Sequence, residues 1–459
     1  MADARLVGVL DVGKTNVKLL VLDRQGRIRD EAATPSASLP GPPYPHLDSE
    51  GVWRWLLDRL AVIAARWPID TLVVTTHGGA AALVDERGLV LPILDYEFEP
   101  PDDGFADAYR AIAPSFAETF APLFPAGLNL ARQIFWQQQA FAEAFRRVRH
   151  ILCYPQYLAW RLSGIAASEV TSLGAHTHLW APQERRFSSL VDRLGWRRLF
   201  PPLRPAWQRL GPIRPEIAAR TGLPDDCGVL CGIHDSNAAL LLYLRSQEPG
   251  FALASTGTWL ILLRPGHPLD TLDPARDTLA NVDATGQAVA TARFMGGREY
   301  AILAGAATAS QVAVGDVQRL VDQETFALPS FAPAGPFPDR AGRIVGPQPE
   351  AAARAALATL YVALMTDVGF DLLEARGDLL VDGGFAANPI YAGLLAALRR
   401  SQAVKLNGAR EGTATGASLL ASWHEPEVAV PLTLAPVAPL EIAGLEAYAR
   451  EWRRRAERP

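Results

Sequence analysis

Two apolar runs that flank a glycine-containing turn near the amino terminus constrain the fold more than any other feature of this sequence. Residues 6–11 and 17–23 are rich in valine and leucine, which favours two β-strands. The octapeptide 8–15, Gly-Val-Leu-Asp-Val-Gly-Lys-Thr, also matches the pattern G-x-x-x-x-G-K-[ST] of a phosphate-binding P-loop. The same residues therefore permit two local structures, a β-hairpin or a strand followed by a loop and a helix.

The residues on either side of the octapeptide favour the hairpin. A P-loop requires a full strand before its first glycine and a helix that begins at its lysine. Only residues 5–7 precede Gly8 with strand character, and the run after Thr15 reaches a turn at residues 23–26 after seven residues. We therefore predict a hairpin and reject the interpretation of the chain as a P-loop nucleoside triphosphatase.

The predicted hairpin still indicates phosphate chemistry. Gly13 permits a tight turn whose backbone N–H groups face an anion, while Thr15 offers a hydroxyl group and Lys18 a positive charge. Asp11, at the end of the first strand, cannot bind phosphate directly because both groups are negative. A carboxylate in this position works through Mg²⁺, so we expect Asp11 to be a metal ligand.

The composition is that of a folded protein in a reducing compartment. The 459 residues are 49% hydrophobic and 20% charged, enough for two large domains. A net charge of −5 without a basic stripe argues against a nucleic-acid partner, and no uncharged run approaches the roughly 18 apolar residues of a membrane span. Three cysteines and the absence of a signal pattern predict a cytoplasmic protein, with a homodimer as one alternative for its oligomeric state.

The order of the expected elements predicts the α/β class. After the hairpin come a third strand, a helix at residues 49–64 and a buried strand at residues 70–76, an order typical of a mixed sheet covered by helices. A second strand-rich stretch begins near residue 251, after a Gln-Glu-Pro-Gly connection. We therefore expect one domain at residues 1–246, a second at 247–425, and a peripheral tail at 426–459.

Four later segments extend the chemistry of the hairpin. Residues 231–236, Cys-Gly-Ile-His-Asp-Ser, place an acid after a small turn, and residues 255–259, Ser-Thr-Gly-Thr-Trp, repeat the strand–Gly–Thr arrangement. Residues 379–389 read as a strand, a glycine pair and a helix start, and residues 412–421 as a glycine-rich helix. In this order and spacing, residues 5–422 resemble the FGGY family of carbohydrate kinases, within the superfamily of actin, hexokinase and the heat-shock chaperone ATPases.

The resemblance implies two actin-like (ribonuclease H-like) domains with an interdomain cleft for ATP, Mg²⁺ and a small-molecule sugar. It implies the following roles: Asp11 toward Mg²⁺, Gly13, Thr15 and Lys18 in the first phosphate loop, Gly257 and Thr258 in the second, Gly383, Gly384 and Asn388 at adenosine, and Asp235 as the catalytic aspartate beside sugar and metal.

Asp235 fits the chemistry that the resemblance implies. Phosphoryl transfer to a sugar hydroxyl requires an aligned hydroxyl, a proton acceptor, Mg²⁺ and a cradle for the phosphates. A carboxylate can accept the hydroxyl proton as the transition state develops. The alternative role of Asp235 is to cap a helix at residues 237–244, and the two roles are compatible.

The sugar side is indicated by Thr-His-Gly at residues 76–78, which resembles a Met-His-Gly stretch of xylulose kinases. There the histidine and a later aspartate hydrogen-bond sugar hydroxyls, which implies His77 and Glu97 as sugar ligands here. Residues 94–97, Leu-Asp-Tyr-Glu, depart from the family's Trp-Asn/Gln-Asp pattern. We expect a small ketose or polyol, first a deoxy-ketose such as L-rhamnulose or L-fuculose, because alanines at residues 80–82 can accept a methyl group.

Other features support weaker hypotheses. His176 and His178 lack a third ligand at metal-binding spacing, so structural or substrate-facing roles are favoured. Gln133 and Trp136, on an expected helix, belong either to the core or to a sugar wall. The alternative for the whole chain is an actin-like or chaperone-like ATPase that drives partner binding, although no separate partner-binding domain is evident.

Overall fold

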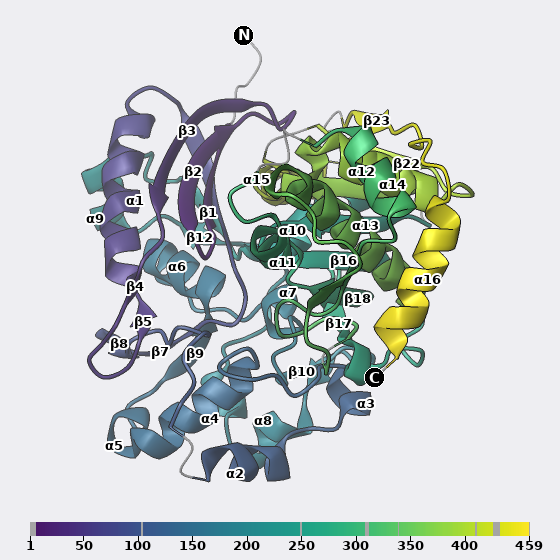
Figure 1. Ribbon diagram of the computed structural model, residues 1–459. Helices are drawn as coiled ribbons and strands as arrows, with labels where there is room; N and C mark the ends of the chain where they lie inside the picture. Colours follow the sequence, from purple (N-terminus) through teal and green to yellow (C-terminus); the bar gives the residue numbers. More distant parts are fainter. Residues whose placement is uncertain are drawn as a thin grey trace. The chain divides into compact units, whose positions relative to one another are not determined.

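The computed structural model divides the chain into two compact units (Figure 1). It describes residues 6–101, 104–247, 250–307, 312–337, 339–408, 411–425 and 432–458. The first unit comprises Met1–Ser246, Ala280–Ala288 and Glu411–Pro431. The second comprises Gln247–Leu279, Val289–Arg410 and Leu432–Pro459. Neither unit is therefore one continuous stretch of sequence, because later segments return to pack on the first unit.

The predicted hairpin is confirmed by the first sheet. Strands β1 (Leu6–Val12) and β2 (Asn16–Leu22) pair antiparallel, with Leu10 opposite Leu19, and the backbone N–H of Gly13 donates to the Asn16 carbonyl at 2.9 Å. Lys14 lies in the turn between these strands, where a P-loop would begin a helix. The octapeptide therefore matches the P-loop pattern without forming a P-loop.

The first sheet is mixed, as expected. Its strand order is β12-β13-β6-β1-β2-β3, with β14 also pairing with β6. Strands β1, β2 and β3 form an antiparallel meander, whereas β6 runs parallel to β1, β13 and β14. The further strands are β3 (Ile28–Pro35), β6 (Ile69–Thr76), β12 (Arg209–Pro212), β13 (Gly228–Leu230) and β14 (Ile233–His234).

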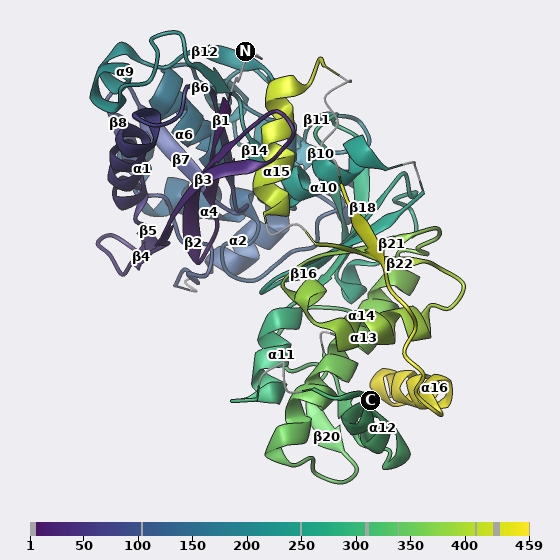
Figure 2. The same ribbon diagram turned by 90° about the horizontal axis from the view of Figure 1, so that it is seen from above.

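Helices cover both faces of this sheet, and Figure 2 shows α1 on one side and α10 and α15 on the other. One face packs on α1, α6 and α9, through a core that includes Leu10, Val12 and Leu19. The opposite face packs on α10 and α15, which approach so closely that a Cβ at Gly416 would lie 1.8 Å from the Ala238 carbonyl oxygen. The helices are α1 (Ser49–Ala64), α6 (Tyr154–Ser163), α9 (Pro215–Thr221), α10 (Asp235–Ser246) and α15 (Gly412–Ser418).

A smaller, partly helical layer completes the first unit. Its three-stranded antiparallel sheet has the order β8-β7-β9, and its own core includes Tyr109, Ile134 and Trp196. This layer includes β7 (Ala81–Asp85), β8 (Gly88–Leu91), β9 (His150–Cys153), α2 (Phe105–Ile112) and α4 (Leu130–Ala140).

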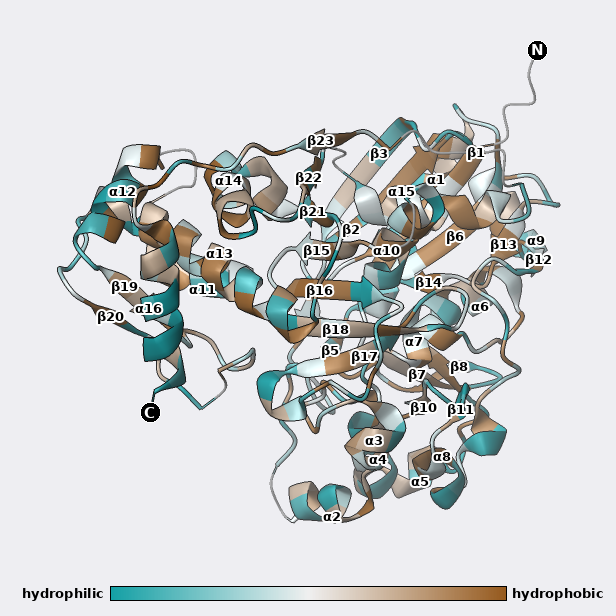
Figure 3. Cartoon of the chain, turned by 90° about the vertical axis from the view of Figure 1, so that its right-hand side faces the viewer, coloured by the Kyte–Doolittle hydropathy of each residue, from teal (hydrophilic) through white to brown (hydrophobic). Residues whose placement is uncertain are grey.

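The second sheet repeats the central pattern of the first. Its order is β17-β18-β16-β15-β21-β22-β23, with β18, β16 and β15 antiparallel and β21 parallel to β15. Both sheets therefore place a parallel strand beside the first strand of an antiparallel meander. The strands are β15 (Ala252–Thr256), β16 (Leu260–Pro265), β17 (Thr278–Val282), β18 (Ala288–Phe294), β21 (Leu379–Gly383), β22 (Val404–Asn407) and β23 (Leu434–Pro436). In Figure 3, β6 of the first sheet and β16 of the second are largely brown, as buried strands are.

Helix α13 (Arg354–Leu372) is the core helix of the second unit. It is long and apolar enough to cross a membrane by length and composition alone, but 89% of its apolar window is buried inside the protein. It packs against α11 (Gly296–Ala304) and α14 (Pro389–Leu398). Burial against these helices accounts for its composition.

The end of the chain is packed more tightly than we expected for a peripheral tail. Helix α16 (Leu445–Glu457) belongs to the second unit, and its Trp452 is 0% exposed. The Trp452 indole N–H donates to the Ala327 carbonyl at 2.6 Å, and Tyr448 stacks on Phe326 with ring centroids 4.4 Å apart. The Arg-rich composition hid this apolar stripe, which repeats at helical spacing.

We therefore expect Trp452→Ala to lower the free energy of unfolding of the second unit by about 3–5 kcal/mol, because the change leaves a cavity in a packed core. Arg450→Ala, an exposed position on the same helix, is the control and should change it by less than about 0.5 kcal/mol. Chemical denaturation monitored by tryptophan fluorescence measures both. Equal effects of the two variants would mean that α16 does not pack in solution as described.

Candidate active site

Strand register brings the main candidate residues of the first unit to one edge of its sheet. Asp11 on β1 lies opposite Thr75 on β6, and Ile233 on β14 lies opposite Thr75 from the other side. His77 and Asp235 follow this row by two residues each. Because these three strands are parallel, their carboxyl ends meet, and Asp11, His77 and Asp235 gather there.

Asp11 lies beside another acid at a partly buried position. Burial, and then the negative charge of Asp235, raise the pKa of Asp11 from 3.8 to about 7, against the opposing effect of Lys18. A carboxyl group in this state gains most from a cation that restores its charge. Mg²⁺ typically binds proteins through one or two carboxylates, with waters and substrate phosphates as its other ligands. Asp11 and Asp235 fit such a site, and the described residues contain no cluster of three or more metal-ligating side chains.

Lys18 lies directly across the hairpin from Asp11. Its ammonium group forms an ion pair with Glu411 at 2.6 Å, across 393 residues of sequence. Glu411 immediately precedes α15, so this pair joins the hairpin to the helix that covers it. The sequence analysis missed Glu411, because no local pattern marks a partner so distant along the chain.

The turn of the hairpin differs in one respect from our expectation. The N–H of Gly13 donates within the turn, so it is already used before any phosphate binds. Thr15 is exposed, and its hydroxyl accepts only a weak 3.3 Å hydrogen bond from the Asn16 side chain. The exposed Thr15 hydroxyl and the Lys18 ammonium therefore remain the stronger candidates for phosphate ligands at this turn.

Asp235 is held at the first residue of α10. Its Oδ1 accepts the N–H of Ser236 at 2.6 Å and lies 3.3 Å from Nε2 of His234. The Asn237 amide lies 3.3 Å from His234 Nδ1, so Nδ1 is the acceptor when the amide donates and Nε2 carries the proton. Burial lowers the pKa of His234, although Asp235 opposes this. His234 is therefore a neutral ring whose Nε2 faces the Asp235 carboxylate.

From the sequence, residues 231–236 predicted a role for Asp235 but none for His234. A signal was available, since a histidine directly before an acid at a strand end can orient that acid. The same packing involves the glycine at position 78, where a Cβ would lie 2.7 Å from His234 Nε2. Gly78 therefore gives His234 room beside Asp235.

His77 has a defined tautomer. Its Nδ1 lies 2.8 Å from the Gly78 carbonyl oxygen, which can only accept, so Nδ1 carries the proton and Nε2 is the acceptor. Burial lowers the pKa of His77, which keeps the ring neutral. The ring packs edge-on between Tyr96 and Tyr154, with centroids 5.6 and 5.7 Å away. His77 can therefore accept a hydrogen bond from a hydroxyl group.

The segment after β8 carries Glu97, the second expected sugar ligand. The Glu97 side chain is 66% exposed, and its carboxylate lies 3.7 Å from the Lys14 ammonium. Its neighbour Asp95 is far more buried, and binds Lys14 and Ser38, each at 2.5 Å. Asp95 and Lys14 were not among the expected site residues, although they form the best-defined polar contact of this segment.

The expected methyl-binding role of the alanines at positions 80–82 is not supported. Ala80 and Ala82 pack into the core under α1, and Ala81 packs into the smaller core. All three are buried by protein, because β7 places successive side chains on alternate faces between two cores. The alanine run therefore reflects packing.

His176, His178 and Gln133 make hydrogen bonds within the protein. His178 is buried between the Tyr109 hydroxyl at 2.9 Å and the Ala121 carbonyl at 3.0 Å. The Nδ1 of His176 lies 3.0 Å from the Leu128 carbonyl oxygen. Because a carbonyl oxygen can only accept, Nδ1 donates this hydrogen bond. Gln133 donates to the Gly79 carbonyl at 2.6 Å and so supports the segment that follows His77.

The candidate residues of the second unit lie at the equivalent strand ends. Gly257 and Thr258 form the turn between β15 and β16, and the Gly257 N–H donates to the Trp259 carbonyl at 2.9 Å. Gly383 has φ +85°, and a Cβ there would lie 2.1 Å from the Thr256 carbonyl oxygen. Only glycine fits at this position, which fixes the path of the chain between β21 and Gly384.

Asn388 is buried and caps α14. Its side-chain oxygen accepts the N–H groups of Ile390 and Tyr391 at 3.1 and 3.2 Å, and its amide lies 3.2 Å from the Thr359 hydroxyl. These contacts account for Asn388 as a structural residue. Contact with adenosine stays a prediction for Gly383, Gly384 and Asn388.

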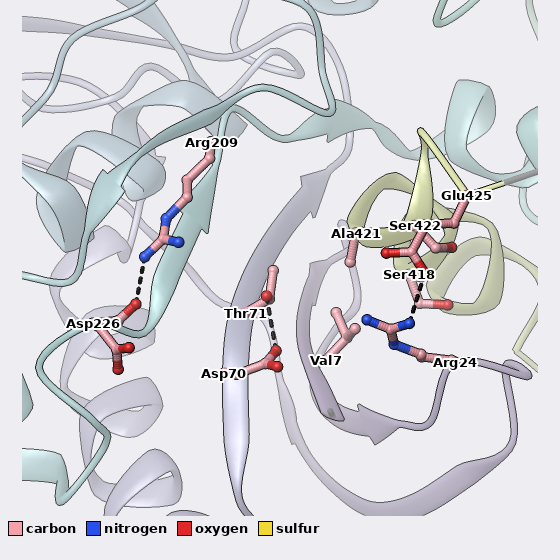
Figure 4. Close-up of a pocket in the computed structure, with 10 residues that line it drawn as sticks. All are labelled: Val7, Arg24, Asp70, Thr71, Arg209, Asp226, Ser418, Ala421, Ser422 and Glu425. Atoms are coloured by element: carbon pink, nitrogen blue, oxygen red, sulfur yellow. Dashed lines mark hydrogen bonds and ion pairs between the residues drawn. The ribbon is translucent and has the colours of Figure 1, made fainter. Parts of the chain in front are cut away.

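A cavity in the first unit lies away from these residues. It has a volume of about 370 Å³ and lies at the amino-terminal ends of β1 and β6, near Val7 and Asp70 (Figure 4). Its wall includes the ion pair of Arg24 with Glu425 at 2.6 Å. Asp11 and Thr76 are at the opposite ends of the same strands, so this cavity is separate from the candidate site.

Comparisons with known proteins support the two-unit fold described above. Residues 117–241 match the N-terminal domain of the FGGY family of carbohydrate kinases, and residues 248–429 match the C-terminal domain of carbohydrate kinase FGGY. A crystal structure of a carbohydrate kinase from Novosphingobium aromaticivorans is 36% identical, covers 99% of each chain and has a TM-score of 0.89. The chain belongs to the FGGY family of carbohydrate kinases.

Two further relatives differ in what they support. An L-fuculokinase of Escherichia coli is 27% identical over 277 residues, which span 57% of this chain and 57% of that protein. A xylulose kinase from Rhodospirillum rubrum has a TM-score of 0.80 over 98% of each chain at 18% identity, and it supports the fold alone.

The raised pKa of Asp11 predicts a pH-dependent effect of Asp11→Asn in the ligand-free protein. A carboxyl group whose pKa is about 7 when folded and 3.8 when unfolded costs the fold stability progressively from about pH 4 to pH 7. Asparagine does not titrate, so the variant should gain stability over the wild type across this window, by up to about 4 kcal/mol above pH 7.

Thermal or urea unfolding of both proteins at pH 5, 6, 7 and 8 measures this difference. A difference that stays the same at every pH would show that Asp11 has an ordinary pKa. Asp226→Asn, at the far end of the sheet, is the control that should show no such trend.

Proposed function

We propose that this protein transfers the γ-phosphoryl group of ATP to a hydroxyl group of a small neutral sugar, with Asp235 as the general base. The observation that carries the proposal is the meeting of Asp235, Asp11 and His77 at the carboxyl ends of three parallel strands. Family membership supports the reaction class. ATP is the phosphate donor in this proposal.

The proposed role of Asp235 follows from its hydrogen bonds. Its Oδ1 accepts hydrogen bonds from Ser236 and lies 3.3 Å from His234 Nε2, whereas no donor among the described residues reaches Oδ2. Oδ2 is then the atom that accepts the proton of the sugar hydroxyl. The hydroxyl oxygen forms its bond to the γ-phosphorus, the bond to the β,γ-bridging oxygen breaks, and ADP leaves.

Asp11, Thr15 and Lys18 are proposed to serve the phosphate side. Bound Mg²⁺ would neutralise charge on the phosphates, and Asp11 and Asp235 are the carboxylates placed to hold it. Lys18 is fixed by Glu411, which limits its side-chain motion. The Thr15 hydroxyl, exposed in the turn, can donate to a phosphate oxygen. Glycines 257 and 383 and their neighbours are proposed to contribute the second phosphate turn and the adenosine side.

The proposed substrate is a small ketose, with L-fuculose and L-rhamnulose ahead of pentuloses. Support comes from the neutral His77, whose Nε2 can accept a sugar hydroxyl, and from similarity to an L-fuculokinase over part of the chain. Glu97 is a second proposed ligand. The cysteines at positions 153, 227 and 231 are free and buried, which is in keeping with a cytoplasmic location.

The first test of this proposal is Asp235→Asn. Removal of the proton acceptor should lower kcat by about 10²- to 10⁴-fold, while the unfolding transition changes little because size and polarity are retained. Asp226→Asn should behave as the wild type. Retention of kcat in Asp235→Asn would exclude this residue as the base, and joint loss of activity and folding would point to a capping role.

The second test concerns the sugar. A coupled ADP assay with ketoses, aldoses and polyols should show turnover that depends on sugar, and His77→Ala should raise the KM of the preferred sugar by about tenfold or more. His424→Ala, at an exposed histidine, is the matched control. An unchanged KM in His77→Ala would remove His77 from the site. ATP hydrolysis that no sugar stimulates would favour an ATPase that acts on a partner.

A further inference from the structure

Lys14 has contacts that its sequence context does not suggest. It stands at the lysine position of the P-loop-like octapeptide, where a phosphate ligand would be expected. In the structure its ammonium group instead binds Asp95 at 2.5 Å and lies 4.6 Å from the centre of the Tyr96 ring. Glu97 lies 3.7 Å away. All three partners belong to the segment that follows β8.

Asp95 is built to receive this lysine. Only 8% of its side-chain surface is exposed, and its second oxygen accepts the Ser38 hydroxyl at 2.5 Å. Its Oδ1 also accepts the backbone N–H of Glu97 at 3.0 Å. Burial alone would raise the pKa of Asp95, but the hydrogen bonds from Lys14 and Ser38 hold it below its usual value. A buried carboxylate of this kind is costly without its partner.

The backbone of Tyr96 is fixed by close packing on two sides. The Gly127 N–H donates to the Tyr96 carbonyl at 2.9 Å, and a Cβ at Gly127 would lie 2.9 Å from the Tyr96 Cα. Gly79, with φ +68°, packs on the Tyr96 ring from the other side. The Tyr96 ring in turn packs edge-on against His77. Lys14, Tyr96 and His77 therefore form one continuous set of contacts.

We propose that Lys14 is a positioning residue for the sugar, not a phosphate ligand. Its ion pair with Asp95 links the hairpin turn to the segment that carries Tyr96 and Glu97. This link keeps the Tyr96 ring, the side of the proposed sugar site next to His77, in place. This inference rests on the proposed function for the identity of the ligand. The two lysines of the hairpin then have different roles. Lys14 positions the sugar site, whereas Lys18, which pairs with Glu411 beside Asp11, contacts the phosphate.

The local charges also restrict the class of sugar. Asp95 neutralises Lys14, while Glu97 and Asp235 leave this part of the first unit negative. A sugar acid would bring a further negative charge to Glu97 and Asp235. Lys14, the cation beside Glu97, is already paired with Asp95, so binding would be weakened. The arrangement therefore fits a neutral polyhydroxylated sugar, whose hydroxyls can use His77 and the carboxylates as acceptors.

Nucleotide binding without sugar separates the two roles of the lysines. The dissociation constant of Mg·ADP, measured by calorimetry, should stay within about twofold in Lys14→Met and Asp95→Asn and rise about tenfold or more in Lys18→Met. Lys405→Met, which removes a lysine paired with Asp378 in the second unit, is the matched control. A tenfold loss of Mg·ADP affinity in Lys14→Met would overturn the proposal.

Steady-state kinetics test the sugar side. With the ketose of highest kcat/KM, Lys14→Met and Asp95→Asn should raise its KM by about 10- to 100-fold, because a misplaced wall weakens substrate alignment. The KM of ATP should change by less than about twofold, and Lys14→Arg should recover most of the loss because it retains the charge. An unchanged sugar KM in Lys14→Met, or a wild type that prefers D-gluconate to every ketose, would overturn the proposal.

The three lysines allow a direct measurement by NMR. Reductive ¹³C-methylation gives side-chain signals for Lys14, Lys18 and Lys405 alone, and Lys→Arg variants assign them. Mg·ADP should shift the signal of Lys18 and leave that of Lys14 in place, whereas the preferred ketose should shift that of Lys14. An Mg·ADP shift of Lys14 as large as that of Lys18 would overturn the proposal. If no sugar is turned over, the proposed function fails separately, and the Mg·ADP arms still decide whether Lys14 contacts phosphate.

Discussion

The chemistry of the first unit depends on the parallel pairing of β1 and β14 with the two edges of β6. This pairing brings Asp11 and Asp235 close enough for the charge of one to disfavour ionisation of the other. Two acids in such a position are unfavourable for folding, because burial and like charge both oppose ionisation. Several neighbouring interactions, including the Lys18–Glu411 ion pair and the His234 contact, are arranged around this pair.

The two sheets share one strand arrangement but carry different side chains at the ends of the equivalent strands. In each, a glycine-containing turn joins the first two strands of a meander, and a parallel strand lies beside the first of them. The row that holds Asp11 and Thr75 in the first sheet holds Ser255 and Asp382 in the second. A polar residue at the strand end is therefore common to both, but the adjacent pair of acids, Asp11 and Asp235, belongs to the first unit.

Sequence reasoning predicted the features that depend on local order. The lengths of the runs around residues 8–15 were enough to choose a hairpin over a P-loop, and the helix that begins at Asp235 starts two residues before its expected position. Contacts between distant residues were beyond it. Nothing near Lys18 indicates Glu411, and the P-loop pattern itself suggested a phosphate role for the residue that the fold places on Asp95.

The packing of α16 shows a different limit. Its Arg-rich sequence suggested a solvated tail, yet Tyr448, Trp452 and Ala456 recur every four residues and form an apolar stripe. Composition averages over all faces of a helix, whereas burial depends on one face. The alanine run at residues 80–82 shows a similar limit. Its composition suggested a ligand pocket, whereas successive side chains point to opposite sides and are buried in two protein cores.

Charge balance connects these observations to the proposed reaction. Around Asp11 itself, the ionised forms of Asp11, Asp235 and Glu411 carry three negative charges and Lys18 one positive charge. The remaining two negative charges equal the charge of one divalent cation, and burial together with the charge of Asp235 raises the pKa of Asp11 to about 7. Asp235 must be ionised before it can accept the hydroxyl proton, and a divalent cation beside Asp11 and Asp235 would keep both carboxylates ionised. The metal ion of Mg·ATP would bring this positive charge together with the phosphate, so substrate binding itself would prepare Asp235 to act.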